Sequence, residues 1–137
     1  MTREETRIDA LWDALNRQDI DAALALLHPD VDWQDVMKGG RLKGAAAMRA
    51  YWTDVYALIR SDSSTLEYSD AGDGRVVARS WHSVCDLKGR LWTEETMTYV
   101  FSFRDGLISR MDLAPAALTI RSAQASRMAS ASRRYFA

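Results

Sequence analysis

Hydrophobic residues in the first part of the chain recur at helical spacing. In the first such segment they lie three or four positions apart, at Ile8, Leu11, Trp12 and Leu15. Thr2 and Glu5, which precede this run, have the spacing of a capping box. The pattern therefore predicts a helix over residues 3–16.

Two further helices are expected before the pattern changes. Asp19 is a suitable N-cap for a short helix that the segment around Pro29 ends. Its apolar residues are Ile20, Ala23, Leu24 and Leu27. The third helix, over residues 45–59, contains no Gly or Pro. It has its large hydrophobic residues on one face: Met48, Tyr51, Trp52, Val55, Leu58 and Ile59.

The remaining segments alternate in polarity with the period of a β-strand. Strands are predicted at residues 31–36, 65–68, 75–87, 91–103 and 107–113. Turns rich in Gly are predicted at residues 38–41, 71–74, 88–90 and 104–106. Helices followed by an antiparallel meander indicate an α+β domain rather than a parallel β–α–β fold.

Alternation also assigns side chains to the two faces of the sheet. One face of strand 91–103 carries the row Glu95, Met97, Tyr99, Phe101 and Phe103. The same inner face is predicted to carry Arg79, Trp81, Ser83 and Cys85 from strand 75–87, and Met111 and Leu113 from the last strand. This assignment turns His82 outward, toward the surface or an interface.

An inner face with so many large apolar residues has to be covered by the helices. Burying each large side chain contributes about 1.5–3 kcal/mol. The polar residues expected on or beside this face are Asp35, Arg79, Ser83, Glu95 and Tyr99. An apolar concavity with a few convergent polar groups is the usual form of a small-molecule site. The alternative is a solid core with these polar groups at its mouth.

Composition narrows the class of protein. A chain of 137 residues with 47% hydrophobic and 27% charged residues is typical of one globular domain. Its net charge of −1 gives no reason to expect nucleic acid or a membrane surface as a partner. With a single cysteine, Cys85, and two histidines, we expect no disulfide, no metal and no cofactor. The charged N-terminus does not resemble a signal peptide, so a cytoplasmic protein is expected.

The C-terminal segment differs from the rest of the chain. After Asp112 no acidic residue follows, whereas four arginines do: Arg121, Arg127, Arg133 and Arg134. We therefore divide the chain into a pocket domain over residues 1–114 and a basic tail over residues 115–137. The tail is interpreted as a solvated terminus that is helical or partly disordered.

Three segments, in this order and spacing, resemble one known family. They are residues 15–35, the Arg41-Leu42-Lys43-Gly44 segment with the helix after it, and residues 101–108. Together they are similar to SnoaL-like and ketosteroid-isomerase-like proteins of the nuclear-transport-factor-2-like superfamily. The resemblance covers residues 5–114. It implies a cystatin-like cone, in which a strongly bent, mostly antiparallel sheet wraps around three N-terminal helices, and it implies a homodimer.

The resemblance also implies roles for particular residues. Asp35 lies where the steroid isomerases have their general base, and Tyr99 lies where they have a hydrogen-bond donor to the substrate oxygen. The alternatives are that Asp35 caps nearby backbone or pairs with Arg41, and that Tyr99 is an ordinary buried tyrosine. Arg79 could bind a ligand carboxylate or pair with Glu95 across the hairpin.

The sequence departs from the isomerase pattern at the main oxyanion-hole tyrosine. Leu11 occupies its position, and Leu27 and Trp52 replace the tyrosines that support it. Loss of one such donor typically costs about 10²–10³ in rate. These departures argue against steroid isomerisation itself and predict a more apolar pocket.

Two hypotheses for function follow. In the first, the protein binds a small hydrophobic carbonyl compound and isomerises, cyclises or dehydrates it, with Asp35 and Tyr99 as the catalytic pair. In the second, it is a non-catalytic ligand-binding or dimerisation module. In either case, the predicted ligand contacts are Leu11, Leu15, Trp33, Met48, Trp52, Val55, Arg79, Trp81, Ser83, Glu95, Met97, Phe101, Met111 and Leu113.

Overall fold

The structure, a computed structural model, describes residues 1–114. The predicted basic tail lies outside the described residues. The elements are α1 (Arg3–Asn16), α2 (Ile20–Leu24), β1 (Leu27–Gln34), β2 (Arg41–Lys43), α3 (Ala45–Tyr56), β3 (Ile59–Asp70), β4 (Val76–Asp86), β5 (Leu91–Arg104) and β6 (Leu107–Leu113).

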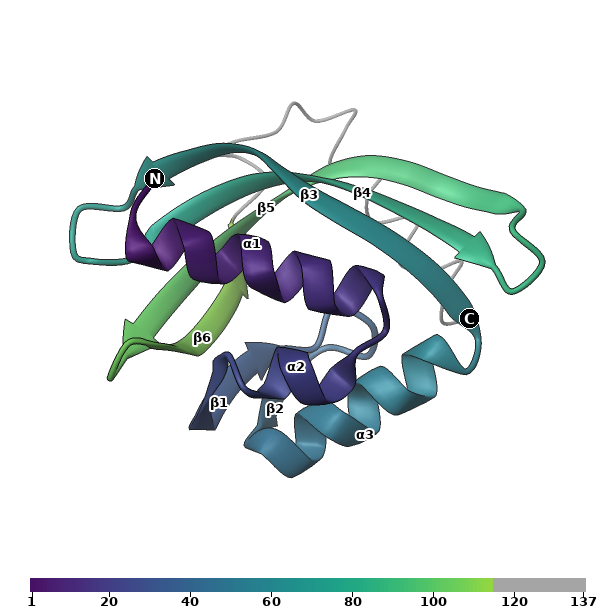
Figure 1. The fold of residues 1–137 in the computed structure, drawn as a ribbon, viewed down its shortest axis with the longest axis horizontal. Coiled ribbons are helices and arrows are strands. Elements are labelled where there is room, and N and C mark those ends of the chain that lie inside the picture. The colour runs from purple at the N-terminus through teal and green to yellow at the C-terminus, as the bar shows by residue number, and fades with distance from the viewer. Residues whose placement is uncertain (115–137) are drawn as a thin grey trace.

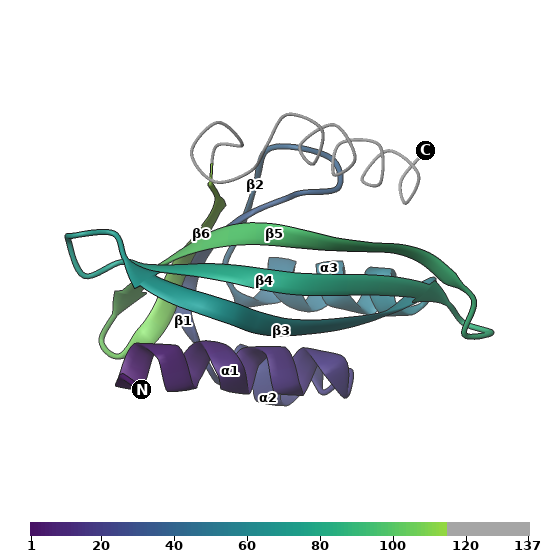
Figure 2. The ribbon, with the colours of Figure 1, turned by 90° about the horizontal axis from the view of Figure 1, so that it is seen from above.

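The strands form one six-stranded sheet in the order β2-β1-β6-β5-β4-β3. All neighbouring strands are antiparallel except β1 and β6, which run parallel. The long strands β3, β4 and β5 bend over α1, and all three helices lie on the concave side of the sheet (Figures 1 and 2). The predicted α+β class, with a bent sheet around N-terminal helices, is confirmed.

Helix α1 forms where the sequence predicts it and packs into the hollow of the sheet. Its capping box is present, because the Thr2 side chain accepts from the Glu5 amide and the Glu5 side chain accepts from the Thr2 amide. The Trp12 ring lies 5.1 Å from the Tyr99 ring and 6.0 Å from the Phe101 ring, measured between centroids. These contacts join the helix to β5.

The pairing of β4 with β5 decides which residues face the helices. Tyr99 lies opposite Ala78, and Glu95 lies opposite His82. Directly paired residues project from the same face of a sheet. Even-numbered residues of β4 therefore share the inner face with the Tyr99 row of β5.

The predicted faces of β4 were therefore wrong. Trp81 does not face the helices, and its indole Nε1 donates a hydrogen bond to Glu94. Arg79 pairs with Glu67, and not with Glu95. Ser83 and Cys85 share the parity of Trp81, whereas His82 points inward. The bulk of Trp81 suggested burial, but the register of the hairpin overrides that preference.

Element boundaries differ from the prediction most at β1, β2, α3 and β3, the last of which spans Ile59–Asp70 instead of residues 65–68. Strand β1 begins at Leu27 and includes the segment expected to be a break. Residues 41–43, predicted as part of a turn and the segment after it, form the short strand β2. Helix α3 ends at Tyr56 because Ile59 already pairs with Asp86 as the first residue of β3.

Candidate functional site

A cavity of about 110 Å³ lies between the concave face of the sheet and helices α1 and α3. This volume is of the order of the roughly 150 Å³ cavity that holds benzene in an engineered protein. Its lining comes from nearly every element: Trp12, Leu15, Trp33, Val36, Met37, Tyr51, Trp52, Val55, Tyr56, Ile59, Ser61, Ser63, His82, Val84, Glu95, Met97, Tyr99 and Met111.

The walls are mainly aromatic and sulfur-containing. Trp33 and Trp52 meet edge to face, with 5.8 Å between ring centroids. Trp12 lines the cavity from α1. Three methionines, Met37, Met97 and Met111, complete the lining with flexible side chains. Such walls favour a small hydrophobic ligand.

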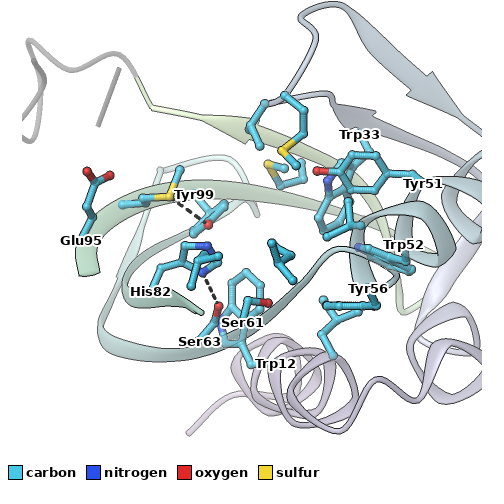
Figure 3. A pocket seen from close by; sticks show the side chains of 18 residues that line it. Trp12, Trp33, Tyr51, Trp52, Tyr56, Ser61, Ser63, His82, Glu95 and Tyr99 are labelled. Atoms are coloured by element: carbon cyan, nitrogen blue, oxygen red, sulfur yellow. Dashed lines mark hydrogen bonds between the residues drawn. The ribbon is translucent and has the colours of Figure 1, made fainter. Parts of the chain in front are cut away.

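Tyr99 places a hydroxyl group inside the cavity. The residue is only 7% exposed, and its hydroxyl donates to the Met97 sulfur at 3.4 Å (Figure 3). A thioether sulfur is a weak acceptor, so this donor is poorly satisfied. Burial raises the pKa of Tyr99 above its usual range, so the phenol stays protonated. Tyr99 can therefore donate to an oxygen atom of a bound molecule.

His82 points into the same cavity from β4. Its Nδ1 is hydrogen-bonded to Ser63 Oγ at 2.8 Å (Figure 3). Burial lowers the pKa of His82 to about 4, and the Asp62 charge opposes this shift only in part. The imidazole is therefore neutral near pH 7, which leaves it able to accept a proton.

Ser63 is itself held in place by helix α1. The Asn16 side chain donates to the Ser63 carbonyl at 2.9 Å and accepts from the Ser63 amide at 2.8 Å. Because β3 is an edge strand, these backbone groups have no strand partner on that side. Asn16 thus fixes the strand position that carries the partner of His82.

Tyrosines of α3 occupy the other end of the cavity. Burial raises the pKa of Tyr51, and the nearby charge of Asp35 adds to the shift. Burial also raises the pKa of Tyr56, while a hydrogen bond with Ser61 acts in the opposite direction. Both phenols are therefore protonated near neutral pH.

Asp35 lies directly after β1 and is used in a turn. The residue is 8% exposed, and its Oδ1 accepts from the amides of Met37 and Lys38, each at 3.0 Å. Its neighbours Val36 and Met37 line the cavity, but Asp35 does not. The alternative of a pair with Arg41 is not observed.

Arg41 instead joins two other carboxylates. It contacts Asp32 and Asp112, each at 2.7 Å, and Arg110 contacts the same two residues. Together they form a closed group of two cations and two anions across β1, β2 and β6. The group ties these strands together outside the cavity lining.

Comparison with protein families now identifies the domain. The family described as the SnoaL-like domain matches residues 8–111. The chain belongs to this family. No curated protein matches the sequence.

Solved structures share this SnoaL-like fold. An NTF2-like protein of unknown function from Burkholderia pseudomallei is 23% identical, over 93% of this chain and 98% of that chain, with a TM-score of 0.72. A candidate polyketide cyclase from Xanthomonas campestris is 26% identical over 89% and 96%, with a TM-score of 0.70. A Mycobacterium tuberculosis protein in complex with estradiol-17β-hemisuccinate is 18% identical over 84% and 95%, with a TM-score of 0.72.

The structure of this SnoaL-like domain separates the predicted contact residues into two groups. Those that line the cavity are Leu15, Trp33, Trp52, Val55, Glu95, Met97 and Met111, together with Tyr99. Those outside the lining are Leu11, Met48 and Phe101, which are fully buried in the core, and Arg79, Trp81, Ser83 and Leu113. The core residues share the inner face but pack against other side chains.

Several lining residues were missed from the sequence. Trp12 and Tyr51 lie on the predicted inner faces of their helices, so helical periodicity could have found them. His82 required the register of β4. Ser61 and Ser63 lie in the part of β3 that was not predicted as strand, and no local pattern marked them as inward-facing.

The SnoaL-like domain shows no arrangement for a metal ion within residues 1–114, where no three His, Cys, Asp or Glu side chains are suitably grouped. In the same residues, no helix has the length and apolar character to cross a membrane.

Proposed function

We propose that this SnoaL-like domain binds a small, largely hydrophobic carbonyl compound in its cavity, with the Tyr99 hydroxyl donating to the carbonyl oxygen. The observation that carries the proposal is the buried Tyr99 hydroxyl, whose present acceptor is the Met97 sulfur. A carbonyl oxygen is a much better acceptor than a thioether, so a ligand of this class gains a hydrogen bond on entry. The aromatic walls bury the rest of the molecule.

We further propose acid–base chemistry at the carbon next to the carbonyl. His82 takes a proton from that carbon through Nε2, while Nδ1–H donates to Ser63 Oγ. The C–H bonding electrons form the enolate, whose oxygen accepts from Tyr99. Return of the proton to a different atom gives isomerisation. In cyclisation the enolate carbon attacks a second carbonyl carbon within the ligand, the C=O π electrons move to that oxygen, and the oxygen takes the proton back from His82. No other reactant is needed for either outcome.

The comparisons support a ligand of this class. One similar structure is described as a candidate polyketide cyclase, and another holds a steroid derivative. A third, TerC, was co-crystallised with polyporic acid. These molecules belong to those proteins, and their shared hydrophobic character agrees with the aromatic walls here.

Hydrogen exchange into α-tetralone in heavy water tests the proposal without knowledge of the natural substrate. The hydrogens next to the ketone are expected to exchange faster with the protein than without it, as followed by proton NMR. Tyr99→Phe removes the donor and is expected to slow the catalysed exchange about a hundred-fold. His82→Gln, which keeps a polar side chain of similar size, is expected to abolish it. Catalysed exchange that is unchanged in either variant would exclude the assigned role.

A non-catalytic binding module is the second candidate function. The observation in its favour is that Asp35, the residue matched to the isomerase base, holds a turn and does not line the cavity. Binding of α-tetralone without any catalysed exchange would support this candidate. The homodimer and the cytoplasmic location expected from the sequence stay predictions.

A further inference from the structure

The two ends of the cavity have separate polar groups. His82, Ser63 and Tyr99 lie at one end in Figure 3, and Trp33 and Tyr51 lie at the other, with the Tyr51 hydroxyl directed toward the interior. All five line the cavity. A ligand that spans the cavity therefore contacts polar groups at both of its ends.

Neither donor at the second end has a partner among residues 1–114. The Tyr51 hydroxyl and the Trp33 indole N–H make no hydrogen bond within this part of the chain, although Trp33 is only 4% exposed. Among the described residues the one fully buried side-chain polar atom without a partner is Thr98 Oγ1, so the Tyr51 hydroxyl and the Trp33 N–H keep some exposed surface through which a ligand can reach them. Indole is a donor only, and a protonated phenol readily donates. The second end thus offers two hydrogen-bond donors that have no acceptor within residues 1–114.

The charges around the cavity argue against an anionic ligand. The Asp35 carboxylate is close enough to Tyr51 to influence its ionisation, and Glu95 lies at the end of the cavity that contains His82. No lysine or arginine lines the cavity in the described chain. A carboxylate or phosphate at the Tyr51 end would therefore be repelled by Asp35, and no cation of the described cavity lining compensates for this repulsion.

We propose that Tyr51 and Trp33 form a second hydrogen-bonding point, and that the ligand is a neutral molecule with two oxygen acceptors, one at each end of the cavity. This inference rests on the proposed function, because it assumes that the first oxygen lies at Tyr99. It adds that the second end recognises a carbonyl, ether or similar uncharged oxygen. Walls of Trp33, Trp52 and Trp12 suit a flat ring system between the two oxygens.

Two tetralones of nearly equal shape test the second point. One carries a methoxy group on the aromatic ring at the far side from the ketone, and the other carries an ethyl group there. Only the methoxy compound has a second acceptor. Affinities measured by quenching of tryptophan fluorescence are expected to favour it about three- to ten-fold, the value of one neutral hydrogen bond.

Tyr51→Phe is expected to remove most of this preference and to leave the affinity for the ethyl compound within about two-fold. Tyr99→Phe is the matched control, because it is expected to weaken both compounds equally and to keep their ratio. A methoxy preference that survives Tyr51→Phe, or no preference in the unmodified protein, would overturn the second point while the Tyr99 contact stands.

Failure of both tetralones to bind would overturn the proposed function as well. A tetralone with a carboxylate at the same position is expected to bind more weakly than either, and tighter binding would contradict a neutral ligand.

Discussion

His82 and Ser63 face each other across β4 and β3, with Nδ1 of His82 2.8 Å from Oγ of Ser63. The contact occupies one nitrogen of the imidazole and leaves Nε2 for the ligand. A hydroxyl can donate or accept, so Ser63 can support His82 before and after it takes a proton. In the proposed chemistry Ser63 is a positioning residue, because it acts through His82.

Ser63→Ala tests this relationship. Without the hydroxyl, the imidazole is expected to populate both neutral tautomers and to turn more freely. The catalysed exchange of α-tetralone should then fall about ten-fold, a fraction of the 10²–10⁴ that general acid–base catalysis provides. Ser63→Thr restores a hydroxyl and is expected to recover most of the rate. Nitrogen NMR of isotope-labelled histidine reports the tautomer directly, and an unchanged tautomer in Ser63→Ala would contradict the positioning role.

The lowered pKa of His82 predicts a pH-dependent stability. An unfolded histidine takes up a proton below pH 6.5, whereas His82 in the folded protein does so only near pH 4. The unfolded state therefore binds more protons in this window, and stability is lost as the pH falls through it. The loss attributable to His82 is expected to be about 1–3 kcal/mol, given about 1.4 kcal/mol per pKa unit.

Urea unfolding at pH 7 and at pH 4 measures this difference. His82→Gln has no ionisable group at the position and should lose less stability over the same range. Asp62 on β3 and Glu95 on β5 are the charged groups nearest to His82 in the sheet. Their own titration is present in both proteins, so the difference in stability loss reports His82 together with its coupling to these groups. An equal loss in the two proteins would show that His82 titrates normally.

Asn16 is expected to be important for stability as well as for the site. Asn16→Ala removes both partners of the Ser63 backbone at the edge of the sheet. The expected cost is about 2–4 kcal/mol in the free energy of unfolding. Arg17→Ala is the control, because the exposed Arg17 side chain makes only a 3.7 Å contact with Asp19 within residues 1–114, so a change below about 0.5 kcal/mol is expected. Similar effects of the two substitutions would contradict the structural role of Asn16.

Asp35 can be tested as a turn residue and as a base at the same time. Asn has an Oδ1 that can accept from the same two amides, so Asp35→Asn should preserve stability within about 0.5 kcal/mol, while Asp35→Ala should cost about 1 kcal/mol. Neither should slow the exchange of α-tetralone by more than about two-fold. A hundred-fold loss in Asp35→Asn would instead assign the base to Asp35, as the family resemblance implies.

The sequence was most informative where the deciding forces are local. The capping box and apolar spacing gave α1 with its observed ends, and alternation after the turn at residues 104–106 gave β6. The inward row of Met97, Tyr99 and Phe101 was also predicted, because one long strand determines its own two faces.

The sequence is least informative about which side chains point inward when this depends on how two strands align. The face of β4 follows from the pairing of Ala78 with Tyr99, and no pattern within β4 specifies that register. His82 was assigned outward for this reason, and the error hid the imidazole of the candidate site. The turn after β1 is readable from the sequence, because Asp35 precedes Gly39 and Gly40. Of the roles considered for Asp35, the capping of nearby backbone is the one observed.

The carbonyl stretching frequency of α-tetralone bound to the protein tests the Tyr99 contact most directly. Hydrogen bonding weakens the C=O bond, so infrared difference spectra are expected to show a lower frequency for the ketone bound to the unmodified protein than for the ketone in hexane. In Tyr99→Phe the bound ketone is expected to return toward the hexane value. An identical carbonyl frequency in the two proteins would contradict the assignment of Tyr99 as the donor.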